Sequence, residues 1–398
     1  MPPLRILSIL NQTYVALCIA LLGVAQPTFA FETPAKAAFV IDQTTGTILL
    51  SKNADTALPP ASMSKLMTLY LAFEALRDGR LRLDEELPVS KHAMAYAGST
   101  MFLNTTDRVR VEDLLRGIIV LSGNDACAVI AEALSPTGTE SGFAAQMNRR
   151  AKELGMTKSH FKNSNGWPDT SHLMSMRDLA LLADRLISDF PDFYPMFAEK
   201  TFLFDGRAKS NTLNRNPLLS LNIGADGLKT GHTKEAGYGI VGSAKQGDRR
   251  IIFVLSGLDS GRDRAKQSEA IVNWSFRQFA KHKIANAETQ IATADVWMGA
   301  ESKIGLVAGK PLEILRPVFG NRDLKAQVIY RGPIPAPIKK GDVLAQLIIS
   351  PDGLPEQSIP LLAAQDVATG GIFERVLTSA RVLIQRFSQG STTPEGAS

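Results

Sequence analysis

Residues 59–73 read PPASMSKLMTLYLAF, and this stretch gives the first indication of the fold and of its chemistry. The two prolines stop an extended chain, and a helix is predicted to begin at Ser62 and to end at Gly79. Apolar residues recur along it at spacings of three and four, which is typical of a helix that turns one face to a core. Residues three apart share a helix face, so the Lys65 amine is predicted to lie beside the Ser62 hydroxyl.

Two further motifs follow in order along the chain, Ser122-Gly123-Asn124 and Lys229-Thr230-Gly231. Each motif alone is weak, because Ser-x-x-Lys can be a helix cap with a solvated lysine, Ser-Gly-Asn a turn and Lys-Thr-Gly a strand end. Together they provide a hydroxyl, an amine that can deprotonate it and a second amine that can bind a carboxylate. That combination predicts a serine acyl-transfer site.

Proton transfer at such a site needs an uncharged amine. A free lysine, with a pKa near 10.4, is almost wholly protonated at neutral pH. We predict that Lys229 lowers the pKa of Lys65, because a nearby like charge and partial burial both disfavour an ammonium group. This effect requires the Lys-Thr-Gly segment to run as a strand alongside the helix that begins at Ser62.

The other motif residues have predicted tasks around the serine and its base. Ser122 can relay a proton, and Asn124 can hydrogen-bond both the catalytic lysine and a substrate amide. Gly231 would let a substrate backbone approach its strand closely. The Thr230 hydroxyl and the Lys229 ammonium suit a substrate carboxylate.

The composition is that of an ordinary globular protein. The chain has 398 residues, of which 44% are hydrophobic and 21% charged, enough for two or three domains. The formal charge of +5 is modest, and no run of five Lys or Arg occurs, so nucleic acid is not an expected partner. The His and Cys residues show no metal-ligand spacing, so we expect neither a metal nor another cofactor.

Residues 1–30 are predicted to be a signal peptide that is cleaved after Ala30. Arg5 supplies a positive start, and residues 14–24 (YVALCIALLGV) form an apolar core followed by small residues. A single membrane-spanning anchor is the alternative, although the apolar stretch is short for a span. Cleavage would leave Cys127 without a disulfide partner, and we expect it to be a small core residue.

The remaining chain divides into segments with different patterns of apolar and turn-forming residues. Strand-like runs at both ends, with helical patterns between them, predict one α/β domain at residues 36–285 whose sheet joins the two ends. Short apolar runs separated by Gly, Pro, Asn and Asp predict a small all-β domain at residues 290–368. An amphipathic helix is predicted at residues 371–387, and a disordered polar tail at residues 388–398.

The predicted helix at residues 371–387 is too short and too charged to span a bilayer, since it carries three arginines. An interfacial helix fits better, with its apolar face in the membrane and its arginines near anionic headgroups. A membrane surface is therefore an expected partner. A helix packed on the all-β domain is the alternative, because the composition fits both.

In the stretches PPASMSKLMT, LSGNDACAVIAEAL, LNRN and DGLKTGHTKEAGYGIVGSA, the chain resembles the low-molecular-mass penicillin-binding proteins, the serine-type D-alanyl-D-alanine carboxypeptidases of peptidase family S11. The resemblance covers nearly the whole chain. It implies an α/β fold of the β-lactamase/transpeptidase type, with an antiparallel sheet flanked by a helical cluster. It also implies removal of the terminal D-alanine from peptidoglycan stem pentapeptides, covalent inhibition by β-lactam antibiotics, and export to the periplasmic face of the inner membrane.

The resemblance also implies a role for each site residue. Ser62 would be the nucleophile, Lys65 the general base and Lys229 the carboxylate binder, while Ser122 and Asn124 would relay protons and position the substrate. The main-chain N–H groups of Ser62 and His232 would form the oxyanion hole. Three further residues match less specifically, and each fits a structural ion pair or polar contact equally well: Arg264, Arg215 and Ser99.

Two rival functions remain open. A class A β-lactamase shares two of the motifs but needs a glutamate, in an ExxLN-type stretch, to activate the deacylating water. Four glutamates lie between the second and third motifs, and none is in such a stretch: Glu132, Glu140, Glu153 and Glu199. We therefore expect a long-lived penicillin adduct. A catalytically silent protein that binds cell-wall peptide is the second rival, and the intact motifs argue against it.

Overall fold

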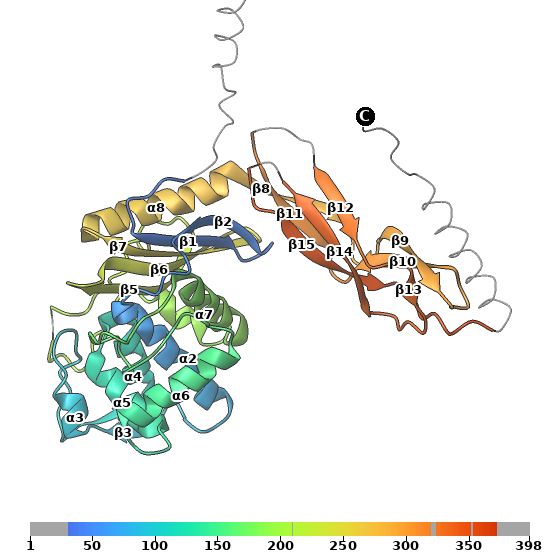
Figure 1. The fold of residues 1–398 in the computed structure, drawn as a ribbon. Coiled ribbons are helices and arrows are strands. Elements are labelled where there is room, and N and C mark those ends of the chain that lie inside the picture. Colours follow the sequence, from blue (N-terminus) through green and yellow to red (C-terminus); the bar gives the residue numbers. More distant parts are fainter. Residues whose placement is uncertain (1–30, 209, 320–323, 352, 372–398) are drawn as a thin grey trace, which may run out of the picture.

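The computed structural model describes most of the chain as two bodies joined end to end (Figure 1). The described residues are 31–208, 210–319, 324–351 and 353–371. The predicted signal peptide, nearly all of the predicted helix at residues 371–387 and the predicted tail lie outside them. The larger body contains all three motifs.

The larger body is built on a five-stranded antiparallel sheet in the order β2-β1-β7-β6-β5. Its strands are β1 (Ala37–Asp42), β2 (Thr47–Lys52), β5 (Ala225–Thr233), β6 (Gly237–Gln246) and β7 (Arg249–Leu258). Val40 of β1 lies opposite Phe253 of β7, so the first hairpin of the domain joins strands that follow some two hundred residues later. β5 is an edge strand, whose outer side is free to pair with an extended peptide.

Both faces of this sheet are covered, and the central strands are therefore buried in continuous runs. On β7, Ile252 and Val254 belong to the core beneath the helical cluster. Their neighbours Phe253 and Leu255 point the other way, into the core beneath α8 (Gly261–Gln278). This three-layer arrangement is visible in Figure 1, with α8 on one side of the sheet and the remaining helices on the other.

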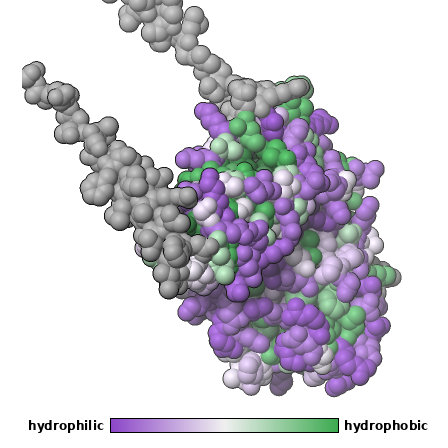
Figure 2. Space-filling view, turned by 90° about the vertical axis from the view of Figure 1, so that its right-hand side faces the viewer, coloured by the Kyte–Doolittle hydropathy of each residue, from purple (hydrophilic) through white to green (hydrophobic). Residues whose placement is uncertain are grey.

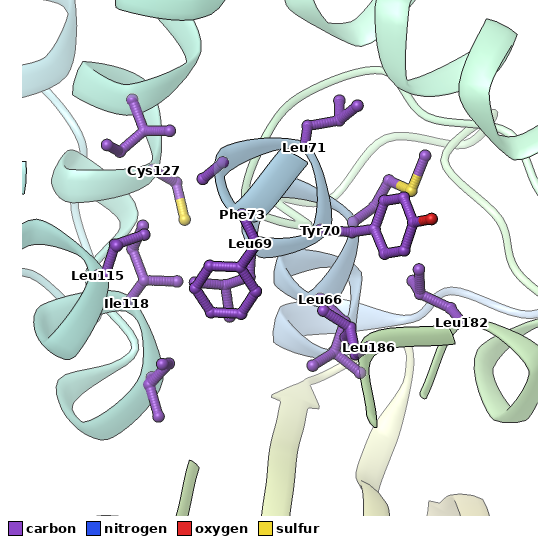
Figure 3. Close-up of a cluster of buried hydrophobic side chains, with 14 of the residues drawn as sticks. Leu66, Leu69, Tyr70, Leu71, Phe73, Leu115, Ile118, Cys127, Leu182 and Leu186 are labelled. Atoms are coloured by element: carbon purple, nitrogen blue, oxygen red, sulfur yellow. The ribbon is translucent and has the colours of Figure 1, made fainter. Parts of the chain in front are cut away.

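The helical cluster surrounds α2 (Lys65–Arg77), which a single 3₁₀ turn, η1 (Ala61–Ser64), precedes. The other elements are β3 (Glu86–Pro88), α3 (Lys91–Met94), β4 (Arg108–Arg110), α4 (Val111–Arg116), the π-helical turn η2 (Gly117–Leu121), α5 (Asn124–Leu134), α6 (Glu140–Glu153), α7 (Met176–Asp189) and η3 (Tyr194–Ala198). Figure 3 shows α2 side chains meeting Leu115, Ile118 and Cys127 on one side and Leu182 and Leu186 on the other. Cys127 is a buried core residue, as predicted.

The helix predicted from the apolar spacing is present as α2, and it is buried on every side: all residues from Lys65 to Ala75 are buried. Leu69 and Ala72 fill positions between the apolar residues that predicted the helix, and the buried polar residues have hydrogen-bond partners. The helix ends near the predicted position, with Gly79 at φ +72°.

The smaller body consists of strands, as the sequence predicted. Six of them form one sheet in the order β12-β14-β15-β10-β9-β13, and β8 pairs with β11. They are β8 (Phe279–Ala285), β9 (Gln290–Trp297), β10 (Lys303–Ala308), β11 (Leu312–Pro317), β12 (Lys325–Ile329), β13 (Ile334–Pro335), β14 (Val343–Ser350) and β15 (Gln357–Ala363). Alternate residues of β14 are buried, which gives this body its own core.

A buried ion pair lies at the junction of the two bodies. Arg249 at the start of β7 donates from Nε to the Asp42 carboxylate at 2.5 Å. Its two terminal nitrogens donate to the carbonyls of Ser275 and Phe279, at 2.7 and 2.6 Å. These carbonyls lie at the C-terminal end of α8 and at the start of β8, where a cation is favourable. The first sheet is thus bonded to the point where the second body begins.

The surface mixes residue types. The face in Figure 2 is largely hydrophilic, with hydrophobic residues interspersed among the polar ones. Within the described ranges, no helix has the length and apolar character needed to cross a membrane.

Candidate active site

The three motifs meet where the helical cluster packs against the edge strand β5. Lys65 Nζ lies 3.0 Å from Ser62 Oγ, because η1 and the first turn of α2 bring side chains three residues apart together. The same nitrogen donates to Asn124 Oδ1 at 2.7 Å and to the main-chain oxygen of Asn165 at 2.6 Å. All three hydrogens of an ammonium group can therefore be accepted here.

The Ser-Gly-Asn motif is placed by an irregular turn between η2 and α5. Ser122 adopts φ +63° and ψ +35°, a left-handed conformation that is uncommon outside glycine and is often found at functional sites. Its buried Oγ has no hydrogen-bond partner. Asn124 begins α5, and its Nδ2 donates to the carbonyl of Ala97 at 2.8 Å, which leaves Oδ1 directed at Lys65.

The Lys-Thr-Gly motif lies on β5, beside η1. Lys229 and Thr230 are buried, and Lys229 Nζ donates one long hydrogen bond, 3.4 Å, to the Thr230 carbonyl. A Cβ on Gly231 would lie 2.9 Å from the Pro60 carbonyl and 3.1 Å from Met63, so glycine here lets β5 approach η1. Close approach of a substrate backbone at this position stays a prediction.

Burial controls the charge state of both lysines. The pKa of Lys65 is lowered to about 8, mainly by burial; the Arg215 charge contributes to the lowering, and Cys127, Asp125 and Glu140 oppose it. Burial also holds the pKa of Lys229 well below its usual value, and the Lys65 charge adds to this. The predicted lowering of the Lys65 pKa is present, but burial is its main cause and Lys229 is not.

Two arginines complete a group of cations at the site. The charges of Lys65, Arg215 and Arg264 all lower the pKa of Lys229, which shows that they converge on it. Arg264 lies in the first turn of α8 with its guanidinium over the Tyr238 ring, and its Nε has no hydrogen-bond partner. Among the described residues, no carboxylate forms an ion pair with any of these four cations. The site can therefore bind an anion.

The remaining candidates lie at the rim. Arg215 Nη1 donates to Ser99 Oγ at 2.5 Å. The structural polar contact that was the alternative role for these two residues is therefore present. The His232 side chain is exposed, and its ring lies 3.9 Å from that of Tyr238, centroid to centroid. A cavity of about 350 Å³ adjoins Ala61 and the end of β5, with Trp167 and Glu235 in its lining.

Sequence reasoning missed the segment around Asn165. Its main-chain oxygen binds Lys65, and a Cβ on Gly166 would lie 1.9 Å from the Ala61 carbonyl, next to the serine. The Asn-Gly pair in NSNGWP was the available signal, since it marks a turn. His172, also missed, lies 2.7 Å through Nε2 from the Ser64 hydroxyl, and burial lowers its pKa to about 4, which keeps it neutral.

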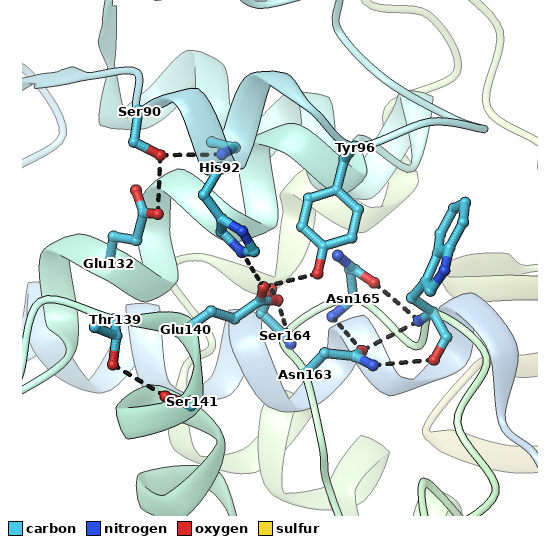
Figure 4. Close-up of polar contacts among 12 residues, drawn as sticks. Ser90, His92, Tyr96, Glu132, Thr139, Glu140, Ser141, Asn163, Ser164 and Asn165 are labelled. Atoms are coloured by element: carbon cyan, nitrogen blue, oxygen red, sulfur yellow. Dashed lines mark hydrogen bonds and ion pairs between the residues drawn. The ribbon is translucent and has the colours of Figure 1, made fainter.

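The four glutamates that bear on the β-lactamase alternative are all engaged away from Ser62. Glu132 accepts from Ser90 Oγ at 2.9 Å, and Glu140 accepts hydrogen bonds from three residues (Figure 4). Glu153 pairs with Arg150 at 2.9 Å and Glu199 with Arg116 at 3.1 Å. None of these carboxylates bonds to the serine or to the catalytic lysine. Elsewhere in the described residues, no group of three or more His, Cys, Asp or Glu could hold a metal ion.

Comparison with protein families gives two matches. Residues 23–260 match the D-alanyl-D-alanine carboxypeptidase family, peptidase S11. Residues 279–369 match the C-terminal domain of penicillin-binding protein 5.

Individual relatives cover most of the chain. D-alanyl-D-alanine carboxypeptidase DacC of Escherichia coli (strain K12) is 37% identical over 350 residues, 86% of each chain. DacF of Bacillus subtilis (strain 168) is 33% identical over 344 residues, 85% of this chain and 87% of the relative. The crystal structure of penicillin-binding protein 5 from Haemophilus influenzae superposes with a TM-score of 0.76 at 31% identity, covering 85% of this chain and 99% of that one. Penicillin-binding protein D2 of Listeria monocytogenes, in its ampicillin-bound form, has a TM-score of 0.56 at 32% identity and covers 62% of this chain and 99% of its own.

Proposed function

Because the chain belongs to peptidase family S11, the D-alanyl-D-alanine carboxypeptidases, we propose that it removes the terminal D-alanine from peptidoglycan stem pentapeptides. Ser62 is the proposed nucleophile and Lys65 its general base. The observation that carries this assignment is the 3.0 Å contact between Lys65 Nζ and Ser62 Oγ, made by an amine whose pKa burial lowers to about 8. An appreciable fraction of that amine is uncharged near neutral pH.

In the acylation step, Ser62 Oγ attacks the carbonyl carbon of the penultimate D-alanine and its proton passes to Lys65. An uncharged Lys65 can donate to Asn124 and Asn165 while its lone pair accepts from the serine, which the three contacts support. The main-chain N–H groups of Ser62 and His232 are proposed to bind the oxyanion. As the peptide bond breaks, the proton returns from Lys65, through the Ser122 hydroxyl, to the nitrogen of the departing D-alanine.

Deacylation uses the same groups in reverse order. Water attacks the ester carbonyl on Ser62, a proton passes to Lys65, and the shortened peptide leaves with a free carboxylate as the serine regains its hydrogen. The steps use no metal and no cofactor.

The cation group provides the proposed specificity for a C-terminal peptide. The substrate carboxylate is proposed to bind Lys229 and the Thr230 hydroxyl, with Arg264 and Arg215 nearby. An anion there would neutralise positive charges of which Lys65 and Lys229 are buried, and which lack a carboxylate partner among the described residues. The peptide backbone can extend along the free edge of β5, where Asn124 can hold an amide.

We further propose that β-lactam antibiotics acylate Ser62 and remain bound for long periods. The Listeria relative has been crystallised in complex with ampicillin and with cefotaxime. The engagement of Glu132, Glu140, Glu153 and Glu199 in other contacts supports slow release, because a β-lactamase of class A needs a glutamate free to activate water.

The test of the proposed function is incubation with a labelled penicillin followed by intact-mass analysis. A stable adduct that disappears in Ser62→Ala supports the carboxypeptidase. Rapid turnover of the penicillin would instead indicate a β-lactamase, and absence of any adduct a silent peptide-binding protein. Release of D-alanine from a synthetic pentapeptide then checks the reaction itself.

The location and the domain boundaries are proposals from the sequence. We propose export by the signal peptide at residues 1–30, a catalytic domain at residues 36–285, a β-rich domain at residues 290–368, and attachment to the periplasmic face of the inner membrane by residues 371–387. The last strand within residues 36–285, β8, pairs with β11 of the smaller body, which favours a boundary before Phe279. The positive start and apolar core of the first segment and the amphipathic pattern of the last support the export and the attachment. A variant ending at Thr369 should leave the membrane fraction, and full retention would contradict the attachment.

A further inference from the structure

Glu140 is a buried carboxylate that the proposed mechanism does not use. It occupies the first turn of α6, after the cap formed by Thr139, and only 7% of its surface is exposed. Burying a carboxylate is unfavourable unless hydrogen bonds compensate it. Here both oxygens accept: Oε2 from His92 Nε2 at 2.6 Å and from the Tyr96 hydroxyl at 2.7 Å, and Oε1 from the Ser164 N–H at 2.8 Å and its hydroxyl at 2.5 Å (Figure 4).

One side of this network leads directly to the catalytic lysine. The Ser164 carbonyl accepts from Thr68 Oγ1 at 2.5 Å, and the next carbonyl, that of Asn165, accepts from Lys65 Nζ at 2.6 Å. Thr68 and Lys65 lie three apart on α2, so two consecutive carbonyls meet two side chains on one helix face. Glu140, by holding Ser164 through two bonds, fixes the segment that presents both carbonyls.

The other side leads to the second partner of the same lysine. Tyr96 is followed by Ala97, whose carbonyl accepts from Asn124 Nδ2 at 2.8 Å. That bond orients the amide so that its Oδ1 faces Lys65 at 2.7 Å. Glu140 therefore joins the two segments, at residues 96–97 and 164–165, that hold the acceptors of the lysine amine (Figure 4).

We propose that Glu140 is a positioning residue for the acylation reaction, and that its carboxylate places the Asn165 carbonyl and the Asn124 amide so that Lys65 stays directed at Ser62. The inference rests on the proposed function, since it assigns a role around the same nucleophile and base. Glu140 touches neither the serine nor the lysine, so its positioning effect passes through these intermediates.

Glu140 also acts on Lys65 through its charge, and this effect provides a readout that a loss of stability would not change. Its negative charge raises the pKa of Lys65, opposing the effect of burial. The titratable side chains in contact with Glu140 are His92 and Tyr96. Removing the charge should lower the Lys65 pKa, so the rise of the acylation rate with pH should occur at lower pH. Loss of stability alone would reduce the amount of active protein and leave that position unchanged.

The experiment measures the second-order rate of acylation by labelled penicillin from pH 6 to 10, normalised to the amount of titratable Ser62. Glu140→Gln keeps the shape of the side chain. In this variant the rise of the acylation rate with pH should occur at lower pH, and the constant rate reached at high pH should be a few-fold below that of the unsubstituted protein. Glu140→Ala should reduce the plateau more than tenfold. Glu132→Gln is the matched control, because it removes a comparable carboxylate from the Ser90 contact without touching residues 164–165.

The outcomes separate this proposal from the one on which it rests. If the unsubstituted protein forms no adduct, the proposed function fails. If it forms the adduct, and Glu140→Gln has the plateau and pH limb of the unsubstituted protein or Glu132→Gln shows the same changes, the positioning role is wrong. Glu140→Gln keeps the test decisive if Glu140→Ala does not fold.

Discussion

The two lysines of the site differ in their hydrogen-bond partners. On the helical side, Lys65 has three acceptors within 3.0 Å, and a chain of hydrogen bonds holds those acceptors. On the strand side, Lys229 has one carbonyl at 3.4 Å, and the Nε of neighbouring Arg264 has no partner. On the helical side the lysine amine itself has all its hydrogen-bond partners without substrate, although the neighbouring Ser122 Oγ has none, whereas on the strand side Lys229 and Arg264 lack an anion. The Lys65 amine is therefore held in place before substrate binds, while the groups around Lys229 gain partners only when an anion binds.

The largest expected effect comes from removing the amine on the helical side. Lys65→Met should lower the acylation rate by about 10²–10⁴-fold, because a general base typically contributes that much. The measurement is the second-order rate of adduct formation with labelled penicillin, with thermal unfolding as the check on folding. A variant that acylates at the normal rate would show that another group takes the Ser62 proton.

Removing the amine on the strand side should act on binding instead. Lys229→Met should lower kcat/KM for a carboxylate-bearing pentapeptide by about 10- to 100-fold, because a hydrogen bond to a charged group contributes about 1.5–3 kcal/mol. The control substrate is the same peptide with an amidated C-terminus, on which the variant and the unsubstituted protein should differ little.

The same variant also tests the cause of the low Lys65 pKa. The sequence argument predicted that losing Lys229 raises this pKa, whereas the structure assigns the lowering mainly to burial. We therefore expect the pH limb of acylation to move little in Lys229→Met. A displacement of a full pH unit toward higher pH would restore the original explanation.

The acylation rate of the unsubstituted protein should change with pH, by less than the loss expected on removing Lys65 and by more than the effect of Ser99→Ala. With a Lys65 pKa of about 8, the uncharged base increases as pH rises through that value, so acylation should be slow below it and level off above it. Between pH 7 and pH 9 the rate should rise about tenfold. A rate that stays flat across this range would mean that the base has a much lower pKa than its burial indicates.

The smallest effect should come from the contact between Arg215 and Ser99. Ser99→Ala removes the acceptor of the Arg215 hydrogen bond but keeps the guanidinium. Since a hydrogen bond between a charged and a neutral group at a partly exposed position contributes about 1 kcal/mol or less, KM for the peptide should rise about two- to fivefold, with kcat unchanged. A larger loss would mean that Ser99 itself contacts the substrate.

The sequence predicted the overall fold well because its signals were local and repeated. Hairpins at both ends of the first domain, a run of helical patterns between them and short strands after residue 290 each carry their own periodicity. The apolar spacing identified the α2 helix but not that every residue from Lys65 to Ala75 is buried. How many neighbours enclose a helix depends on the tertiary fold, which local spacing does not encode.

The sequence predicted those parts of the site that consist of side chains in known motifs. Ser62, Lys65 and Lys229 belong to motifs that can be read from the chain. The Asn165 contribution is a main-chain oxygen, which any residue type would supply, so only its turn signal was available. Glu140 was considered for one chemical role and set aside, because its link to Lys65 passes through Ser164 and depends on segments far apart in sequence.

The buried Asp42–Arg249 pair has a mechanical consequence. A pull on the β-rich domain would arrive at the end of α8 and pass through Arg249 into β1 and β7, the interior strands of the first sheet. β6 lies between those strands and β5, so the load would spread along hydrogen-bonded ladders before reaching the catalytic edge. A force on the smaller body would thus reach the interior strands of the first sheet before it reaches β5.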